Sequence, residues 1–376
     1  MSDFTQFVPE HVRKLAGYTP GKSPRQAHQE SHVNCIKMAS NENPFGPSPK
    51  AVQAMQAALA ESNFYPDNDA IELRQKLAEL HNVKPEQIVP TAGSTALLGI
   101  IARTLLAQGL NAITSARSFI VYPIATQAAG GELVQVPTRN DGFDLDAVAA
   151  VMNPHTRIIY ISNPNNPTGT LLNASELDRF MDKVPDHVIV VLDEAYYDFA
   201  QHFAGLRGVE YSHALDYVNQ GRRVVVLRTF SKAHGLAGVR IGYGIGPGEL
   251  MTYFAKMRTT FSVSAVAQAA ALAAIEDEAH TKKTLKNNAE QSQHLLESLS
   301  ELGYQPVSTW ANFIYCDLKD DAAALAQRMQ NEGIIIRPLG PWGAPTAIRV
   351  TIGTPEQNEM FLRSFKKVTE RATVRS

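Results

Sequence analysis

The sequence has little of several features that define common protein classes. It contains two cysteines, Cys35 and Cys316, and their wide separation favours two reduced thiols over a disulfide. It has neither a cysteine spacing suited to a metal nor the H-E-x-x-H pattern of zinc proteases, so we expect no metal site. These absences exclude disulfide-rich secreted scaffolds and zinc proteases.

Net charge and long apolar runs are scarce as well. The formal net charge is −2, so we expect neither nucleic acid nor an anionic membrane surface as a partner. No apolar run is long enough to cross a bilayer, and residues 1–10 contain acids but no apolar signal-peptide segment. We therefore expect a cytoplasmic protein. Apolar residues make up 44% of the chain, which is enough to bury a large core.

Two glycine-containing segments superficially resemble nucleotide-binding motifs. In residues 17–24 the glycines are one residue too close for a P-loop, and no apolar strand precedes them. In residues 241–248, Pro247 occupies the place of the last glycine of G-x-G-x-x-G. We therefore expect no nucleotide or dinucleotide site in either segment.

Three apolar runs each end in polar residues suited to chemistry. Residues 157–161 lead to Asn166, residues 188–192 lead to Asp193 and Tyr196, and residues 224–227 lead to Lys232. A single lysine at such a place is usually a solvated loop residue. Because open α/β sheets bind ligands at the carboxyl ends of their strands, the three runs together predict one site.

This set of side chains suits pyridoxal phosphate. The amine of Lys232 can form a Schiff base with the cofactor's aldehyde, and the carboxylate of Asp193 can keep the pyridine nitrogen protonated. Tyr196 and Asn166 can hydrogen-bond the ring oxygen. Arg240, eight residues after Lys232, can hold the cofactor's phosphate with two hydrogen bonds.

Three motifs carry a family resemblance. They are Asn-Pro-Asn-Asn-Pro-Thr-Gly at 163–169, Asp-Glu-Ala-Tyr at 193–196 and Ser-Lys-x-x-Gly-Leu-Ala-Gly-x-Arg at 231–240. In this order they resemble the fold-type I aminotransferases, most of all the histidinol-phosphate aminotransferases and their aromatic relatives. The resemblance covers nearly the whole chain. It implies an α/β fold like that of aspartate aminotransferase: a mainly parallel seven-stranded sheet flanked by helices, and a smaller α+β domain.

The resemblance also implies a division of the chain. We expect an N-terminal arm at residues 1–45, a large cofactor-binding domain at 46–265 and a small C-terminal domain at 266–376 that includes part of the arm. The alternation of apolar runs with helical patterns independently predicts βαβ units. We assign no function to the polar, aromatic-rich residues 198–222.

Gly93, Ser94 and Thr95 precede a helical pattern, where free backbone N–H groups favour an anion. An ordinary Ser or Thr N-cap is the alternative. Beside Lys232 and Arg240 we favour binding of the cofactor's phosphate, to which Ser231 also contributes. The resembling enzymes have acidic residues after this glycine, so the side-chain role of Thr95 departs from their pattern.

Two aromatic residues receive roles from the resemblance. Phe119 occupies the place of an aromatic that stacks on the pyridine ring, with Tyr122 as second choice and a core position as the alternative. Tyr65 matches a tyrosine that crosses the dimer interface to the partner's cofactor phosphate. The alternative for Tyr65 is a half-buried anchoring residue. A homodimer with shared active sites is therefore expected.

Arginines are the expected substrate anchors. Arg349 faces away from the apolar residues of strand 347–353 and matches the arginine that binds the substrate carboxylate. Arg337 is a second anion contact, and Tyr18 of the arm is a third candidate. Asn43 lies in a loop that approaches the substrate in the family, although a purely structural turn fits equally well.

The expected activity is transamination from histidinol phosphate to 2-oxoglutarate, giving imidazole acetol phosphate and glutamate. Lys232, Asp193 and Tyr196 are the expected catalytic residues, with Lys232 moving the proton at the substrate's Cα. An aromatic amino-acid aminotransferase and a pyridoxal-phosphate-dependent decarboxylase of the same fold are the alternatives. A non-catalytic module that keeps the fold is the least expected alternative, because Lys232, Asp193 and Arg240 are all present.

Overall fold

The computed structural model describes residues 4–17, 20–31 and 33–373. Its largest sheet has seven strands in the order β2-β8-β7-β6-β5-β3-β4. All neighbouring strands pair in parallel except β8, which is antiparallel to both β2 and β7. The expected mainly parallel seven-stranded sheet is confirmed. Its strands are β2 (Ile88–Thr91), β3 (Asn111–Ser115), β4 (Glu132–Val136), β5 (Thr156–Ser162), β6 (Ile189–Asp193), β7 (Val224–Thr229) and β8 (Gly242–Ile245).

The central strands are buried on both faces because their successive apolar side chains enter two different cores. On β5, Ile158 and Tyr160 join one core, whereas Ile159 and Ile161 join the other. The first core is covered by α5 (Ser94–Leu105), α6 (Val121–Ala128) and α11 (Gly248–Lys256). The second is covered by α3 (Pro49–Ala58), α4 (Ile71–His81), α7 (Leu145–Ala150), α8 (Ala174–Met181), α10 (Ala214–Asn219) and α12 (Ala265–Ile275).

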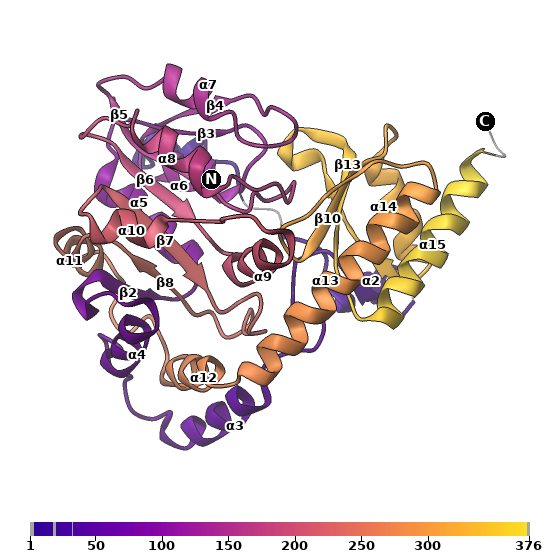
Figure 1. Cartoon of the computed structure of the whole chain (residues 1–376), viewed down its shortest axis with the longest axis horizontal. Coiled ribbons are helices and arrows are strands. Elements are labelled where there is room, and N and C mark those ends of the chain that lie inside the picture. Colours follow the sequence, from indigo (N-terminus) through magenta and orange to yellow (C-terminus); the bar gives the residue numbers. More distant parts are fainter. Residues whose placement is uncertain (1–3, 18–19, 32, 374–376) are drawn as a thin grey trace.

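A second, smaller α+β unit lies beside the large sheet (Figure 1). Its antiparallel sheet has the order β12-β13-β10-β9, with β9 (Pro306–Val307), β10 (Phe313–Asp317), β12 (Arg337–Leu339) and β13 (Ala344–Thr351). Three helices pack on its core: α13 (Glu278–Glu301), α14 (Ala322–Asn331) and α15 (Pro355–Thr373). The long helix α13 runs from beside α12 to this unit, and so connects the two sheets (Figure 1).

The N-terminal segment belongs in space to the smaller unit. Strand β1 (Ile36–Lys37) pairs in parallel with β11 (Ile334–Ile335), nearly 300 residues later in the chain. Helix α2 (Pro24–Ser31) lies next to α14. The exact domain limits at residues 46 and 266 stay a prediction.

The remaining elements are η1 (Thr5–Phe7), α1 (Glu10–Arg13), η2 (Leu59–Glu61), η3 (Pro85–Gln87), α9 (Tyr197–Arg207) and η4 (Gly340–Trp342).

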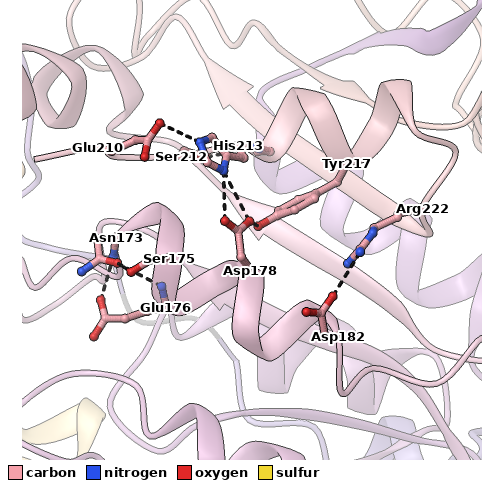
Figure 2. Close-up of polar contacts among 11 residues, drawn as sticks. Asn173, Ser175, Glu176, Asp178, Asp182, Glu210, Ser212, His213, Tyr217 and Arg222 are labelled. Atoms are coloured by element: carbon pink, nitrogen blue, oxygen red, sulfur yellow. Dashed lines mark hydrogen bonds and ion pairs between the residues drawn. The ribbon is translucent and has the colours of Figure 1, made fainter.

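Polar contacts attach α10 and the residues before it to α8 (Figure 2). The Asp178 carboxylate on α8 accepts a hydrogen bond from Tyr217 and lies 3.2 Å from Nδ1 of His213, whose Nε2 lies 2.9 Å from Glu210. Glu210 and Asp178 together raise the pKa of His213 above its usual value. Within the segment 198–222, to which we assigned no function, Glu210, His213 and Tyr217 therefore serve to attach α10 to α8.

Within the part of the chain described here, no helix has the length and apolar character needed to span a membrane. The same residues contain no group of three or more His, Cys, Asp or Glu side chains arranged to hold a metal ion.

Candidate active site

A cavity of about 310 Å³ lies at the carboxyl ends of β5, β6 and β7, between the large sheet and the smaller unit. Its wall brings together residues that are up to 329 positions apart in the sequence (20 to 349). Eleven of the predicted site residues line it: Ser94, Thr95, Phe119, Asn166, Asp193, Tyr196, Ser231, Lys232, Arg240, Arg337 and Arg349.

The Asp193 carboxylate ends β6 and is buried at the floor of the cavity. Its Oδ1 accepts the backbone N–H of Ala195 at 3.2 Å, and its Oδ2 accepts the hydroxyl of Tyr122 at 3.0 Å. Burial raises the pKa of Asp193 to about 6, although the Tyr122 hydrogen bond and the positive charge of Lys232 oppose this rise. A cationic partner in the cavity would restore the ionised form.

Lys232 is poised to lose its proton near neutral pH. Burial lowers the pKa of Lys232 to about 8, and the positive charge of Arg349 contributes, whereas Glu42 opposes the shift. The Lys232 Nζ lies 5.4 Å from the centre of the Tyr196 ring. The Tyr196 hydroxyl accepts a hydrogen bond of 2.8 Å from Nδ2 of Asn41. An amine with this pKa can act as a nucleophile or a base.

The start of α5 and the Arg240 side chain offer hydrogen-bond donors suited to an anion. Gly93 adopts φ +83°, and a Cβ at this position would lie 2.5 Å from the Arg240 guanidinium, so no other residue fits without a shift. Arg240 itself has φ +62°, and its Nη1 donates to the Ala237 carbonyl at 2.9 Å. Ser231 accepts a hydrogen bond from Thr229 at 2.9 Å. Helix N–H groups, hydroxyls and a guanidinium are the donors that bind phosphate.

Two arginines line the cavity from the sheet of the smaller unit. Arg337 and Arg349 are direct cross-strand partners on β12 and β13, and both are buried. Their guanidinium carbons lie 5.0 Å and 5.8 Å from the centre of the Trp342 ring. The Nη1 of Arg349 donates to Oδ1 of Asn166 at 2.6 Å, and its Nη2 donates to the carbonyl of Ala39 at 2.9 Å.

Three of the predicted residues that the structure describes do not line the cavity: Gly93, Asn43 and Tyr65. Asn43 donates to the Ala233 carbonyl at 2.8 Å and to Thr284 at 3.1 Å, so the structure ties it to the Lys232 loop instead of the cavity. Tyr65 is 81% exposed and stacks on Phe261 with ring centres 4.6 Å apart. The contact of Tyr65 with a partner's cofactor phosphate stays a prediction from the family resemblance. Tyr18 lies outside the described residues.

Several wall residues escaped the sequence reasoning. Asn41 and Glu42 line the cavity from the same loop as Asn43. The sequence therefore indicated the right loop but the wrong residue within it. Trp342 ends the short helix η4 of the smaller unit, with no periodic pattern around it, so nothing in the sequence identified it.

The residues present fit pyridoxal phosphate. The cavity offers an amine near its neutral form, a buried carboxylate and a phosphate-type anion site between α5 and Arg240. The buried carboxylate suits a protonated pyridine nitrogen. Fold and site together define the class of the protein as an aminotransferase.

The chain belongs to the family described as aminotransferase class I and II, whose model matches residues 33–365. It is 42% identical over 371 residues to histidinol-phosphate aminotransferase 2 of Pseudomonas aeruginosa, covering 98% of this chain and 99% of that protein. It is similar to the crystal structure of histidinol-phosphate aminotransferase from Sinorhizobium meliloti in complex with pyridoxal-5'-phosphate. That match has a TM-score of 0.87, 27% identity, and covers 98% and 99% of the two chains.

The aspartate aminotransferase from Thermus thermophilus with maleate shares the fold. Its TM-score is 0.82 at 23% identity, covering 96% of this chain and 99% of that chain. The expected aspartate-aminotransferase-like fold is therefore confirmed.

Proposed function

We propose that this protein is a pyridoxal-phosphate-dependent histidinol-phosphate aminotransferase, with 2-oxoglutarate as the acceptor and glutamate as the product. The similarity to curated enzymes of that name supports the proposal, as does a cavity that fits the cofactor. The observation that carries the choice of substrate is the pair of buried arginines, Arg337 and Arg349.

Like charges that face each other across a sheet destabilise it unless an anion lies between them. A phosphate ester carries nearly two negative charges at neutral pH, whereas the α-carboxylate of an aromatic amino acid carries one. The paired guanidinium groups therefore favour a phosphate ester donor. The two carboxylates of 2-oxoglutarate also make it a dianion, so the same pair serves both substrates in turn.

The proposed roles of the other residues follow from their places in the cavity. Gly93, Ser94, Thr95, Ser231 and Arg240 hold the cofactor's phosphate. Asp193 pairs with the pyridine nitrogen, Phe119 packs on the ring, and Tyr196 and Asn166 contact its oxygen.

When bound, the cofactor supplies an electron sink for the electrons of the broken Cα–H bond. Lys232 would hold the cofactor's aldehyde through its amine. Its neutral Nζ would also be the base that takes up the proton from the substrate's Cα. Burial, together with the positive charges of Arg349 and Arg240, lowers the pKa of Lys232, so this amine stays neutral at lower pH than an ordinary lysine.

The proposal includes a homodimer in which Tyr65 reaches the cofactor phosphate of the neighbouring subunit. The exposure of Tyr65 and of its stacking partner Phe261 supports a partner surface at this place. We also propose a cytoplasmic location, because a chain of this size with only two cysteines is typical of a reducing compartment.

A single-turnover half-reaction tests the substrate. The purified enzyme with its cofactor is mixed with histidinol phosphate, phenylalanine or tyrosine, and the loss of the yellow absorbance is followed. We expect histidinol phosphate to react with the highest kcat/KM. Arg337→Ala should lower that value about 10- to 100-fold, with a smaller loss for phenylalanine, because a charge-assisted contact to the second phosphate charge is removed.

Faster reaction with the aromatic amino acids would replace the proposal with an aromatic aminotransferase. Release of carbon dioxide from an amino acid would indicate a decarboxylase. Arg157→Ala serves as a control for loss of a positive charge, because Arg157 does not line the cavity and donates to the backbone carbonyls of Pro154 and Thr156.

A further inference from the structure

Tyr122 is a buried aromatic residue next to the cavity whose role is not explained by packing alone. It lies in the first turn of α6, is fully buried and does not line the cavity wall. Its hydroxyl donates to Oδ2 of Asp193 at 3.0 Å. With the Ala195 N–H on Oδ1, both oxygens of the carboxylate are held by donors from the protein.

The Tyr122 ring is held in place by two other aromatic rings. It stacks on Tyr160 of β5 with ring centres 4.8 Å apart and an interplanar angle of 3°. Phe119 meets it edge-on, with centres 5.7 Å apart and an angle of 86°. Tyr122 therefore connects Phe119, which faces the proposed pyridine ring, to the carboxylate that would face its nitrogen.

The direction of the hydrogen bond is fixed by charge. Burial and the neighbouring Asp193 hold the pKa of Tyr122 well above its usual value, so the phenol stays protonated and donates. A donor to a carboxylate stabilises its ionised form, and an ordered donor also fixes its rotamer. The other charged groups that act on Asp193 are Lys232, which favours ionisation, and Glu194, which opposes it.

We propose that Tyr122 is a positioning residue whose hydroxyl keeps Asp193 ionised and oriented, so that the proton of the pair stays on the cofactor's pyridine nitrogen. This inference rests on the proposed role of Asp193. Without the Tyr122 donor, the carboxylate becomes the stronger base and draws the proton away from the ring nitrogen. The ring then withdraws electrons less strongly.

The test compares two variants that each remove one hydroxyl from the same stacked pair. Tyr122→Phe keeps the ring and removes the donor to Asp193. Tyr160→Phe is the matched control, because the buried Tyr160 hydroxyl has no hydrogen-bond partner among the described residues. Both variants are loaded with cofactor labelled with ¹⁵N in the pyridine ring, and the nitrogen chemical shift reports its protonation.

We expect Tyr122→Phe to move the ¹⁵N signal at pH 7.5 from the pyridinium value toward the neutral value. It should also weaken cofactor binding about 10-fold, measured by equilibrium dialysis, because a charge-assisted hydrogen bond is lost. The kcat should fall while the KM for the amino donor is kept. Tyr160→Phe should match the wild type in all three measurements.

Two results would overturn the inference: an unchanged ¹⁵N signal in Tyr122→Phe, or an equal change in Tyr160→Phe, which would assign the effect to packing. Asp193→Asn separates this failure from failure of the Asp193 role. If Asp193→Asn also leaves the nitrogen signal unchanged, the carboxylate does not face the pyridine nitrogen. If it changes the signal and Tyr122→Phe does not, only the role of Tyr122 is wrong.

Discussion

At the scale of single residues, burial of the Asp193 carboxylate lowers the stability of the cofactor-free protein. Its carboxylate is 3% exposed, and burial raises its pKa to about 6 from an ordinary 3.8. Between these values the folded protein holds a proton that the unfolded chain has released. The stability of the cofactor-free protein therefore falls as pH rises from about 4 to 6, and the loss persists above pH 6.

This sign gives a prediction for the cofactor-free protein. Asp193→Asn should be more stable than the wild type at pH 7.5 by up to about 3 kcal/mol, and nearly equal to it at pH 4. Urea unfolding at both pH values measures the difference. Asp186→Asn, at a fully exposed carboxylate, should change little. A less stable Asp193→Asn at pH 7.5 would contradict the argument.

At the scale of elements, the close approach of β8 to the start of α5 shapes the anion site. A Cβ on Gly242 of β8 would lie 2.6 Å from the backbone nitrogen of Ser94 and 2.9 Å from the Arg228 carbonyl. Only glycine lets the strand pair between β2 and β7 while the first turn of α5 stays in place. The pairing of strands and the geometry of the anion site thus depend on one residue.

Gly242→Ala should therefore lower the free energy of unfolding by about 1–3 kcal/mol, because the strand or the helix must move. It should also weaken cofactor binding, since Ser94 lies at the anion site. Thermal unfolding and a cofactor titration measure the two effects. Gly238→Ala is the control, because a Cβ there meets no atom within 4 Å. Equal behaviour of the two variants would show that β8 has room to adjust.

At the scale of the whole molecule, the proposed dimer requires each chain to contribute its Tyr65 to the active site of the other chain. Tyr65 lies outside the cavity of its own chain and exposes most of its ring. If it reaches a partner's cofactor phosphate, Tyr65→Phe and Lys232→Ala damage different chains of one site. A mixed dimer then has one site with both residues intact.

Mixing the two variants after mild dissociation should restore about a quarter of the wild-type activity, because half of the dimers are mixed and each has one intact site. Each variant alone should stay low. The assay is the half-reaction with histidinol phosphate, and size-exclusion chromatography checks the oligomeric state. Absence of recovery in dimers shown to be mixed would remove the role of Tyr65 across the interface.

The amino-acid pattern alone was enough to predict the large sheet and the edge that carries the site. Residues 158–161, 188–192 and 224–227 are apolar without interruption, which is typical of strands buried on both faces. Because parallel strands end at a common edge, Asn166, Asp193 and Lys232 had to lie near one another. The motifs around them were enough to indicate the cofactor.

The side chains that face this edge from the smaller unit depend on tertiary packing and could not be read from the pattern. Arg337 and Arg349 come from a separate sheet, and their register and the Trp342 ring beside them depend on how the two units pack. Tyr122 reaches Asp193 across 71 residues, while Asn43 turns to Ala233 because its buried amide finds partners there. Local periodicity predicts which residues are buried and on which face, but contacts between distant elements depend on distances that a one-dimensional pattern does not contain.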